Sequence, residues 1–238
     1  MFHPKGPTFF ELAVQALSST DRGYDLLAPK FDYTPFRTPD PVLRIAARNI
    51  GVPLGIDRAL DLCCGTGAAM RFLRPLCREG VVGADRSQGM LAEASRRLAD
   101  APGKAAISLV RADALRLPFR AAFDVVTCFG AFGHILDSDE RRLVASIAAA
   151  LRPGGRFVCA TSDRVSLVRP AWWLARAFNA AMHVRNALHK PEFVMYYLTF
   201  LLPRALELLN AEGFDVAVLR GLFPRPYHRL VLVIATRR

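Results

Sequence analysis

Two carboxylates and a glycine turn occur at a spacing that could hold a nucleotide-like ligand. The apolar run 59–62 contains Asp61 and leads into the turn Gly65-Thr66-Gly67, whose glycines let a backbone approach a ligand closely. We expect a helix to begin directly at this turn, so that its free amide N–H groups point into it. About twenty residues further on, after the apolar run 81–84, Asp85 is placed to accept hydrogen bonds from a ribose diol.

The same residues favour one nucleotide over another. A dinucleotide-binding turn needs a third small residue, and that place, counted from Gly65, is occupied by Met70. The carboxylate of Asp61 would repel a pyrophosphate but would attract an ammonium group. S-adenosylmethionine carries an ammonium and a sulfonium and no phosphate. The sequence therefore predicts S-adenosylmethionine as the cofactor.

Five stretches resemble class I S-adenosylmethionine-dependent methyltransferases, especially the branch that includes the quinone-biosynthesis C-methyltransferases. They follow one another in the family's order within residues 55–161, at 60–67, 85–91, 113–119, 123–126 and 151–155. One departure is Cys63, where most members carry glycine. Cysteine is small enough for the turn, so we expect cofactor binding to survive. Residues 1–45 and 162–203 match much less specifically, and we expect them to select the substrate.

The resemblance implies a set of cofactor-binding residues. Asp113 and the backbone N–H of Ala114 correspond to residues that recognise the adenine edge, although Asp113 could instead cap a turn. Tyr24 lies in a Tyr-Asp-x-x-Ala segment that covers the cofactor in the family, with packing of the N-terminal helices as the alternative. The complete predicted set is Tyr24, Asp61, Cys63, Gly65, Thr66, Gly67, Asp85, Arg86, Met90, Asp113, Ala114 and Phe129.

Alternating apolar runs and helical patterns from residue 59 onward predict an α/β fold with a parallel sheet. We expect strands at 58–63, 80–85, 106–112, 123–129 and 155–161, and helices at 8–19, 41–50, 66–78, 87–99 and 138–151. The resemblance adds strands at 213–219 and 229–235, the last antiparallel and inserted between the fifth and sixth. This is a Rossmann-like, seven-stranded mixed sheet flanked by helices. Within one methyltransferase domain, 1–238, we expect an N-terminal helical segment (1–50), a cofactor-binding core (51–161), a helical lid inserted after strand five (162–203), and a last helix with strands six and seven (204–238).

The segment after the fourth strand is the predicted place of chemistry, because the carboxyl ends of parallel strands carry the site in this fold. It reads Cys128-Phe129-Gly130-Ala131-Phe132-Gly133-His134. Histidine titrates near neutral pH and suits a general base, so His134 is the candidate catalytic residue. The alternative is that His134 packs against or caps the following helix. Phe132 is expected to form an apolar wall against the substrate.

The insertion 162–203 carries the other candidate substrate residues. Its apolar run 193–202 is too apolar for a free loop, so it belongs to the core or roofs a lipophilic pocket. Arg169, Arg176, His183 and Lys190 recur every seven residues and share one face if 169–190 is a helix. That face suits an anionic membrane surface, or it is an ordinary solvated face. The predicted substrate-binding residues are Tyr33, Phe132, Trp172, Tyr196 and Tyr197.

Bulk properties narrow the function classes. The net charge is +11, but only four of the basic residues are lysines, and residues 161–238 hold 11 basic against 5 acidic residues. Long basic runs with interleaved aromatics are missing, which disfavours nucleic acid as a partner. The five cysteines include no Cys-x-x-Cys pair, so we expect reduced core thiols and no metal. With neither a secretory leader pattern nor a spanning segment, the sequence predicts a cytoplasmic location, with peripheral contact to the inner membrane surface left open.

We therefore predict a methyltransferase that acts on a small lipophilic or aromatic acceptor. One alternative is a membrane-lipid methyltransferase docked through residues 164–203. Another is a protein that binds S-adenosylmethionine without catalysis, and an RNA methyltransferase is supported only by the net charge. The sequence does not determine the oligomeric state.

Overall fold

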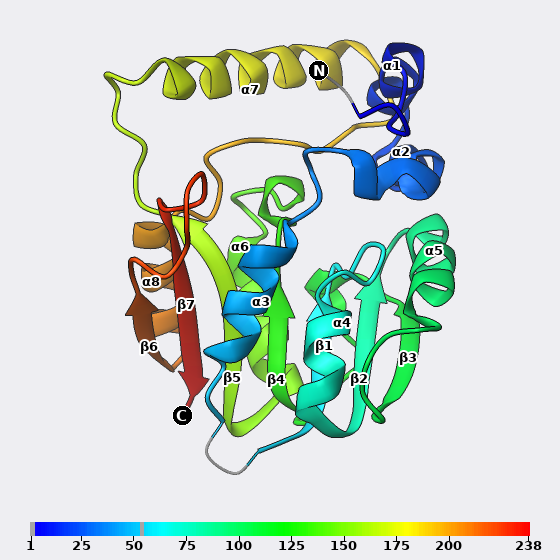
Figure 1. The fold of residues 1–238 in the computed structure, drawn as a ribbon. Coiled ribbons are helices and arrows are strands. Elements are labelled where there is room, and N and C mark those ends of the chain that lie inside the picture. The colour runs from blue at the N-terminus through cyan, green and yellow to red at the C-terminus, as the bar shows by residue number, and fades with distance from the viewer. Residues whose placement is uncertain (1–2, 53–54) are drawn as a thin grey trace.

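The computed structural model describes residues 3–52 and 55–238. Its centre is a seven-stranded sheet in the order β3-β2-β1-β4-β5-β7-β6, shown in Figure 1. The first five strands are parallel, and β7 pairs antiparallel with both β5 and β6. The predicted seven-stranded mixed sheet, with its last strand antiparallel and inserted between the fifth and sixth, is confirmed.

The strands and helices have the following bounds. The strands are β1 (Ile56–Leu62), β2 (Cys77–Asp85), β3 (Ala106–Arg111), β4 (Phe123–Cys128), β5 (Leu151–Ser162), β6 (Phe214–Leu219) and β7 (Leu230–Arg237). The α-helices are α1 (Phe9–Leu17), α2 (Thr20–Leu27), α3 (Asp40–Arg48), α4 (Met70–Leu73), α5 (Gln88–Leu98), α6 (Glu140–Ala150), α7 (Pro170–Leu188) and α8 (Leu202–Ala211). The 3₁₀ turns are η1 (Ala28–Tyr33), η2 (Arg74–Leu76), η3 (Ala114–Arg116) and η4 (Phe132–His134).

Each face of the sheet is covered by helices because successive strand residues point to opposite faces. On one face, Leu60 and Leu62 pack with apolar residues of α6 and α8. On the other face, Ala59 packs with residues of α3, α4 and α5. Burial on both faces explains the continuous apolar runs that the sequence shows at these strands.

A second layer of chain lies above the carboxyl ends of the parallel strands. In Figure 1, α7 crosses the top of the molecule, and α1 and α2 lie beside one of its ends. We call α1, α2, η1, α7 and the loop 189–201 the cap. The capping box of Thr8 and Glu11 starts α1, and Pro170 stands in the first turn of α7, a position where its missing N–H costs nothing. The cap encloses the space in which the predicted site residues meet.

Two sequence predictions about helices need correction. The helix expected at 66–78 is reduced to α4 and η2, and residues 65–69 form turns instead. Gly67 adopts a positive φ of 82°, and Pro75 cannot donate to the helix, so both ends are shortened. The expected helical lid is helical only in α7, because residues 189–201 form an irregular loop. Among the described helices, none is long and apolar enough to cross a membrane.

Candidate active site

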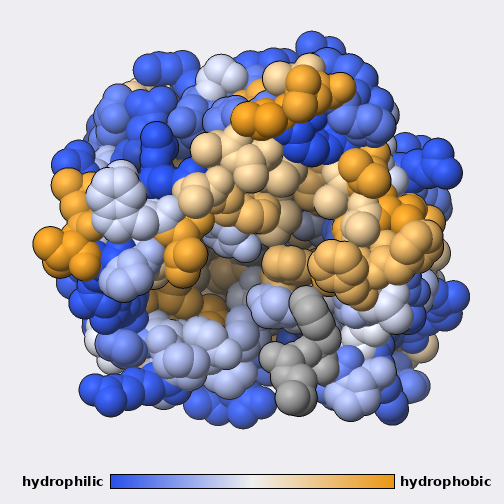
Figure 2. Space-filling model, turned by 90° about the horizontal axis from the view of Figure 1, so that it is seen from above, coloured by the Kyte–Doolittle hydropathy of each residue, from blue (hydrophilic) through white to orange (hydrophobic). Residues whose placement is uncertain are grey.

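A cavity of about 890 Å³ lies between the carboxyl edge of the sheet and the cap. Its floor comes from the ends of β1, β2 and β4 and from the turn 63–66, and its roof comes from α2, α7 and residues 194–199. Ligand pockets commonly measure about 300–1,000 Å³, so the cavity is large enough for a cofactor with an acceptor beside it. Figure 2 looks down on the cap and shows the hollow, with apolar groups along part of its rim.

Asp85 is held in place by backbone amides. Its Oδ2 accepts a hydrogen bond from the N–H of Gly65 at 2.8 Å, and its Oδ1 accepts one from the N–H of Ser87 at 2.9 Å. Burial raises the pKa of Asp85, and these hydrogen bonds oppose that shift. Each oxygen keeps a lone pair that can accept a further hydrogen bond, which suits a ribose diol. The turn's amide is therefore used to orient Asp85, contrary to the expectation that the turn's N–H groups stay free for the ligand.

Asp61 is a buried carboxylate at the point where the strand order reverses. Its β1 position faces Thr127 on β4 in the sheet register, and the Thr127 hydroxyl donates to Asp61 Oδ1 at 2.7 Å. Only 2% of Asp61 is exposed, and burial raises its pKa to about 7. Among the described residues, no cation is paired with it, so a ligand's ammonium group would fit here and would favour the ionised form.

The backbone at position 63, between Asp61 and Asp85, has a conformation that favours glycine. Cys63 has a φ of 54°, a left-handed conformation that costs a residue with a side chain roughly 1–2 kcal/mol. The turn nevertheless forms, and Cys63, Gly65 and Thr66 line the cavity. Gly67 does not line it in the described part of the chain, because it packs under Leu98, whose side chain would lie 2.8 Å from an added Cβ. Gly67 thus supports the turn from outside.

Further predicted cofactor residues also line the cavity. Asp113 accepts a hydrogen bond from the N–H of Leu115 at 3.0 Å, so it does cap η3, as the alternative anticipated, while still facing the cavity with Ala114. Met90 and Phe129 add apolar surface. Arg86 lines the cavity too, but its guanidinium pairs with Asp21 of α2 at 2.9 Å. It therefore joins the cap to the floor.

Tyr24 and His134 meet across the cavity wall. The Nδ1 of His134 lies 2.6 Å from the carbonyl oxygen of Val194, which can only accept, so Nδ1 carries the proton. The Tyr24 hydroxyl lies 2.7 Å from Nε2 and therefore donates to it. Burial lowers the pKa of His134 and raises the pKa of Tyr24, which keeps both groups neutral. His134 is a packed residue and a neutral acceptor at the same time.

The predicted substrate residues divide into two groups. Phe132, Tyr196 and Tyr197 line the cavity, and Phe132 stacks on Phe200 with ring centres 4.4 Å apart. Tyr33 and Trp172 do not line the cavity that the described residues enclose. Tyr33 stacks on His3 at the outside of the cap. Trp172 packs against Trp173 and under the guanidinium of Arg176.

Asp25 was missed by sequence reasoning, although it follows Tyr24 directly. Its Oδ1 accepts hydrogen bonds from the hydroxyl of Ser87 at 2.6 Å and from the N–H of Gly89 at 2.8 Å. It thereby docks α2 on the N-terminus of α5, an end that favours a carboxylate. An added Cβ at Gly89 would lie 2.8 Å from Asp25 Cα, so only glycine allows this approach.

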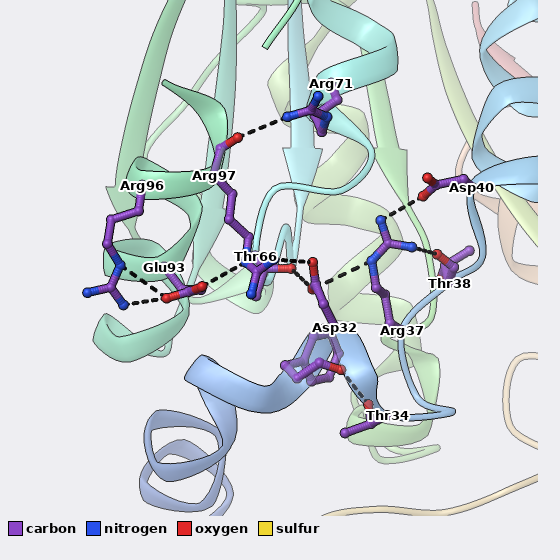
Figure 3. A network of polar contacts seen from close by, with 11 residues as sticks. Asp32, Thr34, Arg37, Thr38, Asp40, Thr66, Arg71, Glu93, Arg96 and Arg97 are labelled. Atoms are coloured by element: carbon purple, nitrogen blue, oxygen red, sulfur yellow. Dashed lines mark hydrogen bonds and ion pairs between the residues drawn. The ribbon is translucent and has the colours of Figure 1, made fainter. Parts of the chain in front are cut away.

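Asp32 was missed as well, and Figure 3 shows the network around it. The hydroxyl of Thr66, in the turn, donates to Asp32 at 2.6 Å. Arg97 of α5 pairs with Asp32 at 3.0 Å, and Arg37 lies 3.5 Å away. The network ties η1 of the cap to the turn and to α5. No local pattern could have revealed it, because its members are far apart in sequence.

Two asparagines of α7 bind the loop 189–201 of the cap. Asn179 donates to the carbonyl oxygen of Tyr197 at 2.9 Å and accepts from its N–H at 2.8 Å. One heptad later, Asn186 makes the same exchange with Phe193 at 3.1 and 3.0 Å. The loop also approaches η4, where the N–H of Tyr196 donates to the carbonyl of Gly133 at 2.8 Å. These bonds fix residues 193–197 above the cavity, near Gly65 and Phe129.

Comparison with known proteins points in the same direction. Residues 59–155 match the model of a family described as "Methyltransferase domain". The demethylmenaquinone methyltransferase of Clavibacter sepedonicus is 37% identical over 133 residues, which are 55% of this chain and 52% of that protein. The ubiquinone/menaquinone biosynthesis C-methyltransferase UbiE of Desulfotalea psychrophila is 36% identical over 182 residues, 75% of this chain and 62% of that protein. The chain spans about half the length of such relatives.

A solved structure extends the likeness to nearly the whole chain. The complex of DhpI with SAH superposes with a TM-score of 0.61 at 20% identity, covering 96% of this chain and 98% of that one. At this identity the likeness shows the fold. The predicted resemblance to S-adenosylmethionine-dependent methyltransferases is confirmed by the matches together.

Proposed function

We propose that this protein is an S-adenosylmethionine-dependent methyltransferase whose acceptor is a small, lipophilic aromatic molecule of the quinol type. The observation that carries the proposal is one cavity that combines two carboxylates in different environments on its floor with an apolar roof. The match of residues 59–155 to the methyltransferase domain supports the activity. The names of the relatives, which act in menaquinone and ubiquinone biosynthesis, support the acceptor class.

The floor residues fit the cofactor's chemical groups. Asp85, oriented by two amides, would accept the ribose hydroxyls, and Asp61, with its raised pKa and no protein cation among the described residues, would take the ammonium group. Asp113 and Ala114 would line the adenine end. S-adenosylmethionine supplies an activated methyl group for in-line displacement, so the protein has to align the acceptor and exclude water.

The apolar residues of the wall and roof fit an aromatic, lipophilic acceptor. Phe132, Ile135, Leu198 and Leu201 line the same cavity as Tyr196, and α7 contributes Ala171 and Ala175 to it. Such a wall offers little to a strongly polar acceptor, whose desolvation would not be compensated. A flat quinol ring can stack on the aromatic side chains while its tail follows the apolar wall.

Tyr24 and His134 provide a route for the acceptor's proton. Alkylation of a quinol ring carbon is easier when a neighbouring hydroxyl loses its proton, because the ring then becomes electron-rich. The hydroxyl proton would pass to the Tyr24 oxygen while the Tyr24 proton moves to Nε2 of His134, whose lone pair already accepts that hydrogen bond. The proposal thus assigns His134 the role of base and Tyr24 the role of the group that contacts the acceptor.

Methyl transfer from radiolabelled S-adenosylmethionine to a panel of acceptors tests the function. The panel contains a reduced naphthoquinone with an isoprenoid tail, the same ring without the tail, catechol, phosphatidylethanolamine and a transfer RNA. We expect the tailed naphthoquinol to be methylated on a ring carbon with the largest kcat/KM. Transfer to phosphatidylethanolamine alone would favour the membrane-lipid alternative and would refute the quinol proposal.

A matched variant separates the acceptor site from the cofactor site. Phe132→Ala opens the apolar wall and leaves Asp61 and Asp85 in place, so it should raise the KM for the quinol and leave S-adenosylmethionine binding within about twofold. Failure of the wild type to bind S-adenosylmethionine by calorimetry would contradict the whole proposal.

A further inference from the structure

The outer faces of α1 and α7 carry an unusual amount of exposed apolar surface. On α1, Phe9 and Phe10 are 83% and 75% exposed, and on α7, Trp173 and Leu174 are 62% and 71% exposed. We call this surface the docking face. It comprises Phe9, Phe10, Val14, Leu17, Leu167, Val168, Trp173, Leu174, Val184 and Leu188, all of them exposed. Exposed large apolar side chains gathered in this way mark a site of interaction.

The two sides of α7 face different surroundings. Of its 19 residues only Met182 and Asn186 are buried, and Ala171 and Ala175 face the cavity. At about 100° per residue, Trp173, Val184 and Leu188 fall on the opposite side and form a stripe along the helix. An ordinary surface helix buries its apolar face and exposes its polar face. α7 instead uses polar side chains for its inner contacts and exposes an apolar stripe. We therefore expect this exposed stripe to contact an apolar partner.

A row of basic residues borders the apolar stripe. Arg169, Arg176, His183 and Lys190 are all exposed and follow one another at seven-residue spacing. Residues 164–191 contain five lysines or arginines and no aspartate or glutamate. Basic side chains beside exposed tryptophan and leucine are typical of helices that lie in the headgroup region of anionic bilayers.

Hydrogen bonds join the end of α1 to the end of α7. Arg185 of α7 donates to the carbonyl oxygens of Ala16 and Ser18 at 2.9 and 3.0 Å. His189 lies 3.0 Å from the carbonyl oxygen of Leu17. These contacts fix the end of α1 against the end of α7, so that both helices can meet a flat surface together. Figure 2 shows orange apolar groups in several places on this top face, with blue hydrophilic groups between and around them.

We propose that the docking face binds the surface of an anionic membrane. Apolar side chains of α1 and α7 would enter the acyl boundary, and Arg169, Arg176 and Lys190 would pair with headgroup phosphates. A second copy of this chain fits less well, because self-contact through this face would bring two basic rows together. The cavity lies directly beneath α7, so a docked molecule would hold its cavity next to the bilayer. Only this last point, the delivery of a lipophilic acceptor, rests on the proposed function.

The chain contains its own reporter for this proposal. Its only two tryptophans, Trp172 and Trp173, are adjacent on α7. Intrinsic tryptophan fluorescence therefore reports on this helix alone. With vesicles of phosphatidylcholine containing about one third phosphatidylglycerol, we expect a blue shift and quenching by brominated acyl chains. Vesicles of phosphatidylcholine alone should give a much weaker response.

Matched variants locate the binding surface. Leu174→Glu with Leu188→Glu leaves both tryptophans in place and should abolish flotation with anionic vesicles. Leu76→Glu is the control, since Leu76 is 40% exposed in η2, at the opposite edge of the sheet. Arg169→Gln with Arg176→Gln should weaken partitioning about twenty-five-fold, since each basic residue near the surface contributes about fivefold. Arg120→Gln, an exposed arginine in the loop before β4, should change nothing.

The outcomes separate docking from catalysis. Each variant is also tested for S-adenosylmethionine binding and for methyl transfer to a tail-less naphthoquinol in solution, and both should match the wild type. Wild-type protein that transfers methyl groups but ignores anionic vesicles would overturn docking and leave the function standing. Vesicle binding without any methyl transfer would overturn the proposed function and leave docking standing. Self-association that the α7 variants abolish, with vesicle binding absent, would assign the face to a second copy instead.

Discussion

The floor of the cavity and its cap are stabilised by different kinds of contact. On the floor, β1 lies between β2 and β4 in continuous backbone ladders, and Asp85 is oriented by two backbone amides. In the cap, α7 buries only two side chains, and side chains such as Asn179, Arg185 and Asn186 bond it to the loop 189–201. Segments with few buried contacts open at lower free energy than core strands. The cofactor side of the cavity is therefore preorganised, whereas the acceptor side can change its conformation when a ligand binds.

Two junctions connect these regions. One is His134, which lies on the floor and is hydrogen-bonded to Tyr24 and Val194 of the cap. The other is Asp32, which reaches from the cap to Thr66 in the turn and Arg97 in α5. Changes at the floor, at the cap and at the junctions should therefore have separable effects on binding, turnover and stability.

Substitution of His134 should give the largest effect, a loss of turnover. We expect His134→Ala to lower kcat by about 10²–10⁴-fold, the range for loss of a general base, with little change in cofactor affinity. Tyr24→Phe should lower kcat as well, because it removes the hydroxyl that contacts the acceptor. The control is His183→Ala, an exposed histidine 3.3 Å from the Tyr196 hydroxyl on the same cap. Unchanged turnover in His134→Ala, measured with a verified acceptor, would make His134 purely structural.

The floor residue Asp85 should give the next largest effect. Asp85→Ala removes the acceptor of the ribose hydroxyls and also leaves the amides of Gly65 and Ser87 unpaired. We expect cofactor binding to weaken by about 1.5–3 kcal/mol, as for hydrogen bonds to a charged group. Asp100→Ala, at an exposed position after α5, is the control for calorimetry. Wild-type affinity in Asp85→Ala would exclude the assigned ribose site.

The floor residue Asp61 should make cofactor binding depend on pH. Its pKa is raised to about 7 by burial, and only its ionised form pairs with an ammonium group. Affinity should therefore fall roughly tenfold per unit as the pH drops below about 7, with proton release on binding. Calorimetry in buffers of different ionisation enthalpy measures that release, and Asp61→Asn should bind weakly with no such dependence. Since burial lowers the pKa of His134, kcat should stay flat over the same range.

Asp61 should also affect the ligand-free protein, with the opposite sign. A carboxyl whose pKa rises from 3.8 to about 7 on folding favours the folded state when protonated, and this contribution is lost as the pH rises between those values. Asp61→Asn should therefore raise the unfolding temperature by a few degrees at alkaline pH and by less at acid pH. A pH-independent difference between the two proteins would contradict the raised pKa.

The junction at Asp32 should give the smallest effect on the ligand. Asp32→Ala leaves Arg37 and Arg97 without their shared partner, which should lower the free energy of unfolding by about 1–3 kcal/mol and cofactor affinity by only a few-fold. Hydrogen exchange should speed up in α1, α2 and η1 while the sheet stays protected. Asp40→Ala, which removes a carboxylate that pairs with Arg37 at the rim, is the control. Equal exchange in both variants would show that Asp32 does not hold the cap.

The sequence was most informative where function depends on local order. Asp61 and Asp85 lie near the ends of two buried strands, and the turn at 65–67 follows the first of them. The apolar pattern located all three, and the resemblance implied the place of the last strand in the sheet. The helix expected at 66–78 was too long because the pattern did not register the effect of Gly67 and Pro75. The pattern also could not show that the turn's amide at Gly65 is used by Asp85 rather than by a ligand.

The sequence was least informative where contacts join distant segments. Nothing near Asp32 or Asn186 indicates that they meet Thr66 or Phe193, since such pairs depend on how the cap folds back over the sheet. Trp172 was expected to bind the substrate, but it is not among the residues that line the described cavity, because the rotation of α7 decides which of its sides faces inward. The hydrogen bonds of Asn179 and Asn186 to the loop 189–201 help to set that rotation.

A crystal structure with S-adenosylhomocysteine tests the central claim most directly. The account predicts ribose hydroxyls within hydrogen-bond distance of Asp85, the amino group beside Asp61, and the sulfur facing the part of the cavity bounded by Tyr24, His134 and Phe132. The cap should remain above the ligand, with Tyr196 over the acceptor space. Density for the ligand with its ribose away from Asp85, or outside the cavity beneath α7, would contradict the account.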